Sequence, residues 1–239
     1  VLLAAQGALA LLFGLLGAAL GGDLLTACEE LACPVRNDGI VLCRHDALLD
    51  DLLEKISEGD IVVISGSMPK GSPEDTYYVW TKACREKGAK VILDADGALF
   101  ATGVKASPYL VKPNNHELSR FAGRKLETVE ELEAEAKKLM QDYGIKKVVV
   151  SMGGDGALYV TEEKTIYAEG LKVPVGSTVG AGDSVVAALA FAEENGNSLE
   201  DTVRLSTATG GANVMCSGTQ AAEYEVIESL MPKVVFRTL

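Results

Sequence analysis

From residue 47 onward, short apolar runs alternate with segments whose hydrophobic residues recur every three or four positions. The recurrence predicts amphipathic helices, and the unbroken apolar runs are typical of strands buried on both faces of a sheet. The predicted helices cover residues 47–57, 74–87 and 129–143, and the predicted strands cover 61–64, 90–94 and 147–150. Strands and helices alternating at this spacing predict an α/β fold, with a doubly wound, mostly parallel sheet and helices on both faces.

Polar or small residues follow several of these strands, at 65–71, 112–117 and 151–156. In a parallel sheet, ligands bind beyond the carboxyl ends of the strands, so each of these loops is a candidate site. Asn114 and Glu117 have an alternative interpretation, because an Asn cap with Glu three residues later forms a capping box. The Gly-rich turn at 151–156 also has two interpretations. Such a turn is usually just a hairpin, but at this edge of the sheet a nucleotide phosphate could lie against its backbone.

A glycine-rich turn at residues 175–184 precedes the continuous apolar segment 185–192, a pattern that predicts a tight turn feeding a buried helix. The first backbone N–H groups of such a helix have no partner within it, so they favour an anion, and glycines let the anion approach. An acidic residue in that turn would be repelled by a phosphate unless it takes a proton from the group that attacks the phosphate. The alternative is that Asp183 merely caps the helix.

Composition narrows the classes of function. The chain has 239 residues, 48% of them hydrophobic, which is enough for one substantial core and a single α/β domain. A net charge of −12 argues against a nucleic-acid partner, so any phosphate must be held by a local site. The five cysteines are odd in number and lack C-x-x-C spacing, as expected of reduced thiols in a cytoplasmic protein.

Residues 1–25 are almost entirely Leu, Ala and Gly and carry no charge before Asp23. A basic flank is missing and the glycines are spaced like turns, so we expect buried helix and strand segments and no membrane partner. Two alternatives stay open: a membrane-associated segment, or a chain that is truncated or interrupted relative to a longer protein.

Five stretches, taken together and in this order, resemble the motifs of the ribokinase-like, or PfkB, carbohydrate kinases, and most closely those of the 1-phosphofructokinase branch. They are Ser-Gly-Ser-Met-Pro at 65–69, Asp94, Lys-Pro-Asn at 112–114 with Glu117, Val-Val-Ser at 149–151 with Gly153 and Gly156, and Thr-Val-Gly-Ala-Gly-Asp-Ser at 178–184. The resemblance covers about residues 47–234 and implies a ribokinase-like fold.

The resemblance also implies a role for each matching residue. Asp183 would be the general base, and the amides of Gly180, Ala181 and Gly182 would form the anion hole for the transferred phosphoryl group. Asn114 and Glu117 would organise Mg²⁺, and Lys112 would reach a phosphate of ATP. The remaining residues expected to contact the nucleotide are Ser151, Gly153, Gly156, Thr178 and Asn213.

The activity implied is ATP-dependent phosphorylation of a sugar phosphate, foremost fructose 1-phosphate to fructose 1,6-bisphosphate. Tagatose 6-phosphate, another sugar or a nucleoside is the alternative acceptor, and a nucleotide-binding module without turnover is the alternative class. The family's N-terminal Gly-Gly motif and small β lid, through which relatives form homodimers, have no match in residues 1–46. The sugar site is therefore unassigned: Arg36, Asn37 and Lys70 are candidates, with solvated surface charges as the alternative.

Overall fold

The computed structural model describes residues 2–4, 41–68, 72–218 and 220–239, with side chains from residue 48 onward. Most of the Leu/Ala/Gly-rich tract lies outside the described residues, as do Arg36, Asn37 and Lys70. The expectations for the sugar site and for a β lid therefore stay predictions.

The described strands form one mixed sheet in which every strand lies beside its neighbours in the chain. Strands β1 to β5 are parallel, and β5 to β8 pair in antiparallel fashion. The strands are β1 Leu2–Ala4, β2 Ile61–Ser65, β3 Lys90–Asp94, β4 Leu110–Val111, β5 Lys147–Ser151, β6 Ala157–Thr161, β7 Thr165–Ala168 and β8 Phe236–Thr238. The predicted α/β class, with a largely parallel sheet, is confirmed.

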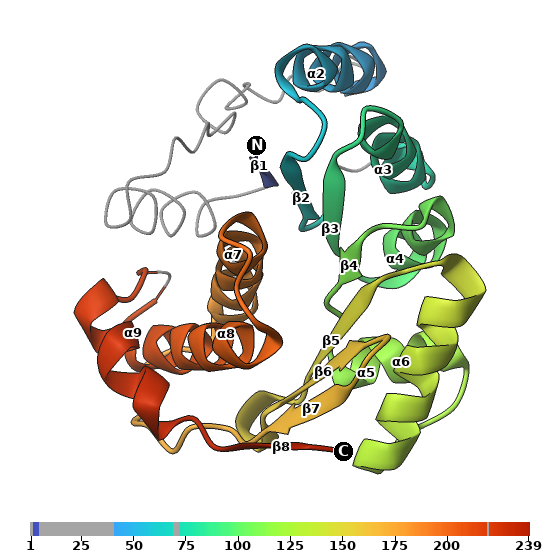
Figure 1. The fold of residues 1–239 in the computed structure, drawn as a ribbon. Helices are drawn as coiled ribbons and strands as arrows, with labels where there is room; N and C mark the ends of the chain where they lie inside the picture. Colours follow the sequence, from blue (N-terminus) through green and yellow to red (C-terminus); the bar gives the residue numbers. More distant parts are fainter. Residues whose placement is uncertain (1, 5–40, 69–71, 219) are drawn as a thin grey trace.

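Helices cover both faces of this sheet (Figure 1). On one side lie α2 Val41–Lys55, α3 Thr76–Glu86, α4 Gly97–Gly103, α5 Asn115–Ala122 and α6 Val129–Tyr143; on the other lie α7 Ala181–Glu194, α8 Leu199–Met215 and α9 Tyr224–Leu230. Short 3-10 turns occur at Val104–Ala106, Gly153–Asp155 and Met231–Lys233.

Two hydrophobic cores result from the alternation of side chains along the strands. In β2, Ile61 and Val63 pack toward α7 and α8, whereas Val62 and Ile64 pack toward α2 and α3. The other central strands divide their side chains in the same way. The sheet is thus buried on both faces, which explains why its strands are continuous apolar runs.

Element boundaries differ from the predictions by a few residues. Helix α2 begins at Val41, six positions before the predicted start, and α3 begins at Thr76, two positions later than predicted. The late start of α3 has a local cause, because both the amide and the hydroxyl group of Thr76 donate to the Pro73 carbonyl, at 3.2 and 2.7 Å. That turn occupies the residues that the apolar periodicity had placed in the helix.

Gly156 shows why the turn between β5 and β6 is glycine-rich. Its φ is +110°, and a Cβ atom there would lie 1.9 Å from the Ala168 carbonyl oxygen. Gly154, two residues earlier, has open space around its Cβ position and no such backbone requirement. The two glycines therefore form a matched pair of test sites in one turn.

We predict that Gly156→Ala lowers the free energy of unfolding by about 2–4 kcal/mol, because the side chain requires both a strained φ and a shift of the β7 backbone. Urea denaturation followed by circular dichroism measures the change. Gly154→Ala is the control and is expected to stay within about 0.5 kcal/mol of the parent. Equal effects of the two substitutions would contradict this account.

Candidate active site

The first turn of α7 is an open helix N-terminus. Gly180 occupies the N-cap position with φ +81°, and among the described side chains none caps the helix there. Asp183 lies three positions inside the helix, so the alternative interpretation of Asp183 as the cap is wrong. Of the predicted anion-binding amides, that of Ala181 makes a long hydrogen bond to the Thr178 carbonyl at 3.4 Å. The turn is therefore suited to an incoming anion.

The loop before this turn is held against the end of α8. The amides of Gly176 and Ser177 donate to the Val214 carbonyl at 2.8 and 3.1 Å, and a Cβ at Gly176 would lie 2.5 Å from the Cys216 carbonyl oxygen. Asn213, one residue before Val214, is 4% exposed and donates from Nδ2 to the Gln220 carbonyl at 3.0 Å. These contacts bring the predicted nucleotide residue Asn213 to the same region as the α7 turn.

Lys112 is the central buried cation of this region. It follows β4, its side chain is only 6% exposed, and its Nζ lies 3.1 Å from Oδ1 of Asp94 at the end of β3. A Cβ atom at Gly182 would lie 3.6 Å from the same Nζ, so the ammonium group faces the first turn of α7. The structure thus brings Lys112 and Gly182 together, as expected for residues that share one phosphate.

Asp183 is a half-buried carboxylate beside this ion pair. Burial raises the pKa of Asp183, the negative charge of Asp94 raises it further, and the Lys112 ammonium lowers it. A carboxylate with a raised pKa is a better proton acceptor near neutral pH than an ordinary aspartate. The environment of Asp183 is therefore consistent with the predicted role of a base.

Asn114 and Glu117 form the capping box that was their alternative interpretation. Asn114 Oδ1 accepts from the amides of His116 and Glu117, each at 2.9 Å, and Glu117 Oε2 accepts from the Asn114 amide at 2.8 Å. Burial raises the pKa of Glu117, the Asn114 amide and Lys112 lower it, and Asp94 and Asp96 raise it. The cap is confirmed, and the role in organising Mg²⁺ stays a prediction.

The turn after β5 meets the start of α5. The Ser151 amide donates to the Pro113 carbonyl at 3.0 Å, and Asn114 and Ser151 form an isolated parallel bridge. Gly153 lies exposed in the 3-10 turn, whereas Gly156 is buried against β7. Ser151 therefore lies beside Asn114, Gly153 is open to solvent, Gly156 shapes the turn from within, and the contacts of Ser151 and Gly153 with a nucleotide stay a prediction.

Asp94 was matched as a motif residue but was not among the predicted site residues. It contacts Lys112 directly, and Ser65 Oγ donates to its Oδ2 at 3.4 Å. The sequence did contain a signal for Asp94, because it is a charged residue directly after the apolar run of β3, where ligands bind in parallel sheets.

The described part of the chain offers neither a side-chain cluster for a metal ion nor a membrane-spanning helix. No group of three or more Asp, Glu, His or Cys side chains there is arranged to hold a metal ion. Within the same residues, no helix has both the length and the apolarity that a membrane span needs.

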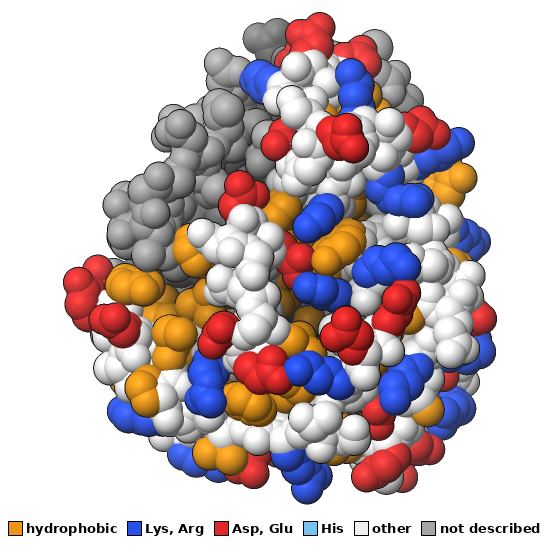
Figure 2. Space-filling model, viewed as in Figure 1, with side chains coloured by type: hydrophobic (Ala, Val, Ile, Leu, Met, Phe, Trp, Pro, Cys, Tyr) orange, Lys and Arg blue, Asp and Glu red, His pale blue; other side chains and the backbone are white. Residues whose placement is uncertain are grey.

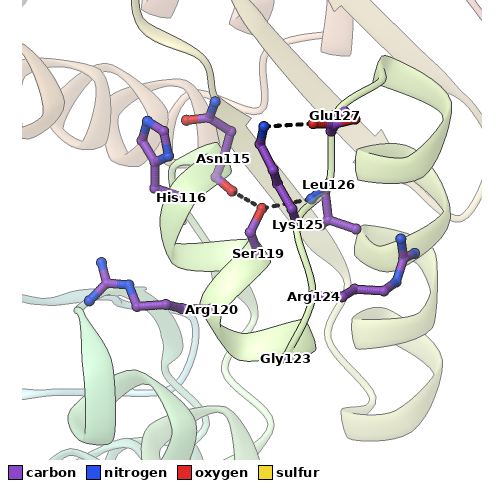
Figure 3. A pocket seen from close by; sticks show the side chains of 9 residues that line it. All are labelled: Asn115, His116, Ser119, Arg120, Gly123, Arg124, Lys125, Leu126 and Glu127. Carbon is purple, nitrogen blue, oxygen red and sulfur yellow. Dashed lines mark hydrogen bonds and ion pairs between the residues drawn. The ribbon is translucent and has the colours of Figure 1, made fainter.

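A hollow of about 790 Å³ lies on the outer side of α5 and the loop to α6 (Figure 3). It contains none of the predicted site residues, and its cations are already paired: Arg120 with Asp96, Arg124 with Glu131, and Lys125 with Glu127. Elsewhere on the face shown in Figure 2, acidic and basic side chains are interspersed. The buried Lys112 region is therefore the better candidate for binding phosphate, since its cation faces an open helix N-terminus.

Comparison with known proteins gives a family and several relatives. The model of the pfkB family carbohydrate kinases matches residues 35–225. The 1-phosphofructokinase of Bacillus subtilis is 38% identical over 181 residues, which are 76% of this chain and 59% of that protein. The D-tagatose-1-phosphate kinase of Bacillus licheniformis is 34% identical over 176 residues, 72% of this chain and 58% of that protein.

A solved relative is similar in fold as well. The structure of phosphofructokinase-2 from Escherichia coli in complex with fructose-6-phosphate matches with a TM-score of 0.73 at 30% identity, covering 79% of this chain and 60% of that one. The chain thus spans less than two thirds of the length of each of these relatives.

We predict that Lys112→Met destabilises the protein by about 3–5 kcal/mol at pH 7, because it leaves Asp94 buried without its counter-charge. The loss should be smaller at pH 5, since Lys112 lowers the pKa values of Asp183 and Glu117, and without it these two carboxyl groups take up protons more readily as the pH falls. Urea denaturation at both pH values measures the effect. Lys82→Met, at an exposed pair with Glu86, is the control and should change stability by less than about 1 kcal/mol. An equal loss at both pH values would rule out the electrostatic explanation.

Proposed function

Because this chain belongs to the pfkB family of carbohydrate kinases, we propose that the protein transfers the γ-phosphoryl group of ATP to a hydroxyl group of a sugar phosphate. The observation that carries the proposal is a half-buried carboxylate, Asp183, inside an uncapped glycine-rich turn that faces the buried Lys112 ammonium. A base, an anion-binding backbone and a cation at one point are what phosphoryl transfer requires of a protein.

In this proposal, Asp183 accepts the proton of the attacking sugar hydroxyl group. The amides of Gly180, Ala181 and Gly182 donate to the phosphoryl oxygens as negative charge develops on them. Since the Ala181 amide already makes a long bond to the Thr178 carbonyl, the Gly180 and Gly182 amides are proposed to carry most of this interaction. Lys112 adds a positive charge on the side of the turn that carries Gly182.

The residues at the start of α5 fit a magnesium ion that is held mainly by water and phosphate. Glu117 supplies one partly buried carboxylate, and one of its oxygens, Oε2, is used by the capping box. Bound there, Mg²⁺ would neutralise charge on the phosphates of ATP. Asn114 and Glu117 are the residues proposed to orient it, and Ser151, Gly153, Gly156, Thr178 and Asn213 are proposed to shape the nucleotide site.

Fructose 1-phosphate is the proposed acceptor, with fructose 1,6-bisphosphate as product. The name of the B. subtilis relative supports this choice. The names of the B. licheniformis and E. coli proteins support a tagatose phosphate or fructose 6-phosphate as the second candidate. ATP and sugar phosphates are metabolites of the cytoplasm, so the proposal implies that location.

We predict that Asp183→Asn lowers kcat at least about 10²-fold in the intact protein, because the amide cannot accept the proton. The measurement is ADP release with fructose 1-phosphate, fructose 6-phosphate, tagatose 1-phosphate and tagatose 6-phosphate compared side by side. Asp201→Asn is the matched control, because Asp201 lies at the same helical position in α8, three residues after its cap Ser198. Undiminished turnover in folded Asp183→Asn would overturn the proposed base, and absence of turnover with every acceptor in the parent would overturn the kinase.

The same substitution should stabilise the fold. The pKa of Asp183 is raised in the folded state, so ionisation costs stability as the pH rises above the unfolded value. The Asn variant should therefore unfold at a higher temperature than the parent at pH 7, and the difference should shrink toward pH 4. Thermal unfolding at the two pH values gives the comparison.

We predict that Glu117→Gln raises the Mg²⁺ concentration needed for half-maximal activity several-fold while stability changes little, because Gln keeps the capping hydrogen bond and removes the charge. Glu131→Gln is the matched control, since Glu131 occupies the same position in the capping box of α6. If both variants require the same Mg²⁺ concentration as the parent, Glu117 acts only in the cap.

A further inference from the structure

The Asp94 carboxylate joins three elements at the carboxyl edge of the sheet. Parallel pairing of β2 and β3 places Ser65 directly opposite Asp94, and Ser65 Oγ donates to Asp94 Oδ2 at 3.4 Å. The other oxygen, Oδ1, lies 3.1 Å from Lys112 Nζ. Both oxygens of this carboxylate are thus held by side chains from neighbouring strands.

The serine side of this arrangement is itself fixed. The Tyr77 hydroxyl group from α3 lies 3.2 Å from both the Ser65 and the Gly66 carbonyl oxygens, and the Gly66 amide donates to the Asp94 carbonyl at 3.1 Å. Tyr77 is only 1% exposed. Asp94 is therefore held by a rigid part of the core, whereas Lys112 has a long side chain that needs an anchor.

We propose that Asp94 is a positioning residue for phosphoryl transfer: its carboxylate holds the Lys112 ammonium against the first turn of α7 and balances its charge beside Asp183. This inference rests on the proposed function. Its geometric basis is the ion pair at 3.1 Å together with the approach of Nζ to Gly182.

The charge balance has a chemical consequence. Among the residues that the structure describes, the charged groups that face Asp183 are Asp94 at the end of β3 and Lys112 after β4, and Glu117 on α5 faces the same ammonium. A lone ammonium would favour the ionised form of Asp183 and make it a weaker base. Asp94 acts in the opposite direction, so the site keeps a cation for phosphate without losing the basicity of Asp183.

A purely structural ion pair is the competing explanation, since buried pairs hold many folds together without any part in chemistry. The two explanations differ in what they predict for Asp183. A structural pair affects the amount of folded protein, whereas a positioning residue also changes the proton affinity of the base and the value of kcat in molecules that remain folded.

The test is Asp94→Asn, which keeps the size of the side chain and an oxygen that can accept from Ser65. We expect kcat to fall about 10–100-fold and the acid limb of the kcat/KM profile to move to lower pH, because Asp183 becomes a weaker base. NMR titration of the Asp183 carboxyl carbon should show its pKa lowered. Asp94→Glu keeps the charge, so its kcat and the pH of its acid limb should lie closer to those of the parent than the values of Asp94→Asn do. Asp96→Asn, at an exposed pair with Arg120, is the control and should leave both unchanged.

A double-mutant comparison tests whether Asp94 acts through Lys112. In a Lys112→Met background, Asp94→Asn should lower kcat less than it does in the parent, because the cation that Asp94 positions is gone and only the direct effect of its charge on Asp183 remains. An unmoved acid limb together with an unchanged Asp183 pKa in Asp94→Asn would overturn the inference, as would a full additional loss of kcat in the double variant. The NMR titration needs no turnover, so it distinguishes failure of this inference from failure of the proposed kinase activity.

Discussion

The buried charge of Lys112 is the constraint on which the arrangement of the site depends. The Lys112 side chain is only 6% exposed, so its positive charge needs negative charge nearby. Asp94, Glu117 and Asp183 supply that negative charge from three separate elements. Each lies at or beyond the carboxyl edge of the sheet, where parallel strands place their following residues side by side. The cation thereby lowers the pKa of the candidate base and of the capping carboxylate of α5, and in both groups burial is the larger cause and acts in the opposite direction.

Well-packed secondary-structure elements hold these charged groups in fixed positions. The sheet is buried on both faces, and its alternating side chains form one core with α7 to α9 and another with α2 to α6. Helix α7 carries Asp183 one turn before its buried middle segment, residues 186–190, and α5 begins with a complete capping box. The groups that would meet a phosphate therefore belong to the ends of well-packed elements, which is the arrangement that positioning demands.

The same site is a source of local instability. Burial and a nearby negative charge raise the pKa of Asp183, so keeping it ionised at neutral pH costs folding free energy. The N-cap position of α7 is occupied by Gly180, which leaves the N-terminus of this helix without a side-chain partner among the described residues. The first feature weakens the fold, and the second leaves backbone donors open to an anionic ligand, a combination expected where binding energy is used for chemistry.

Local patterns in the sequence determined the order of strands and helices, because periodicity and strand-end residues depend on near neighbours; they also singled out the α7 turn with Asp183 and Gly182. The sequence did not predict exact boundaries such as the start of α3, because a hydrogen-bonded turn at Pro73 occupies residues that apolar periodicity had assigned to the helix. The structure confirmed the capping box of Asn114 and Glu117, which the sequence had offered as one interpretation, and placed Gly180 instead of Asp183 at the N-cap position of α7. Only the tertiary structure decided that Asp94 holds Lys112. The pairing of Asp94 with Lys112 depends on which strands become neighbours, and that is set by the whole sheet.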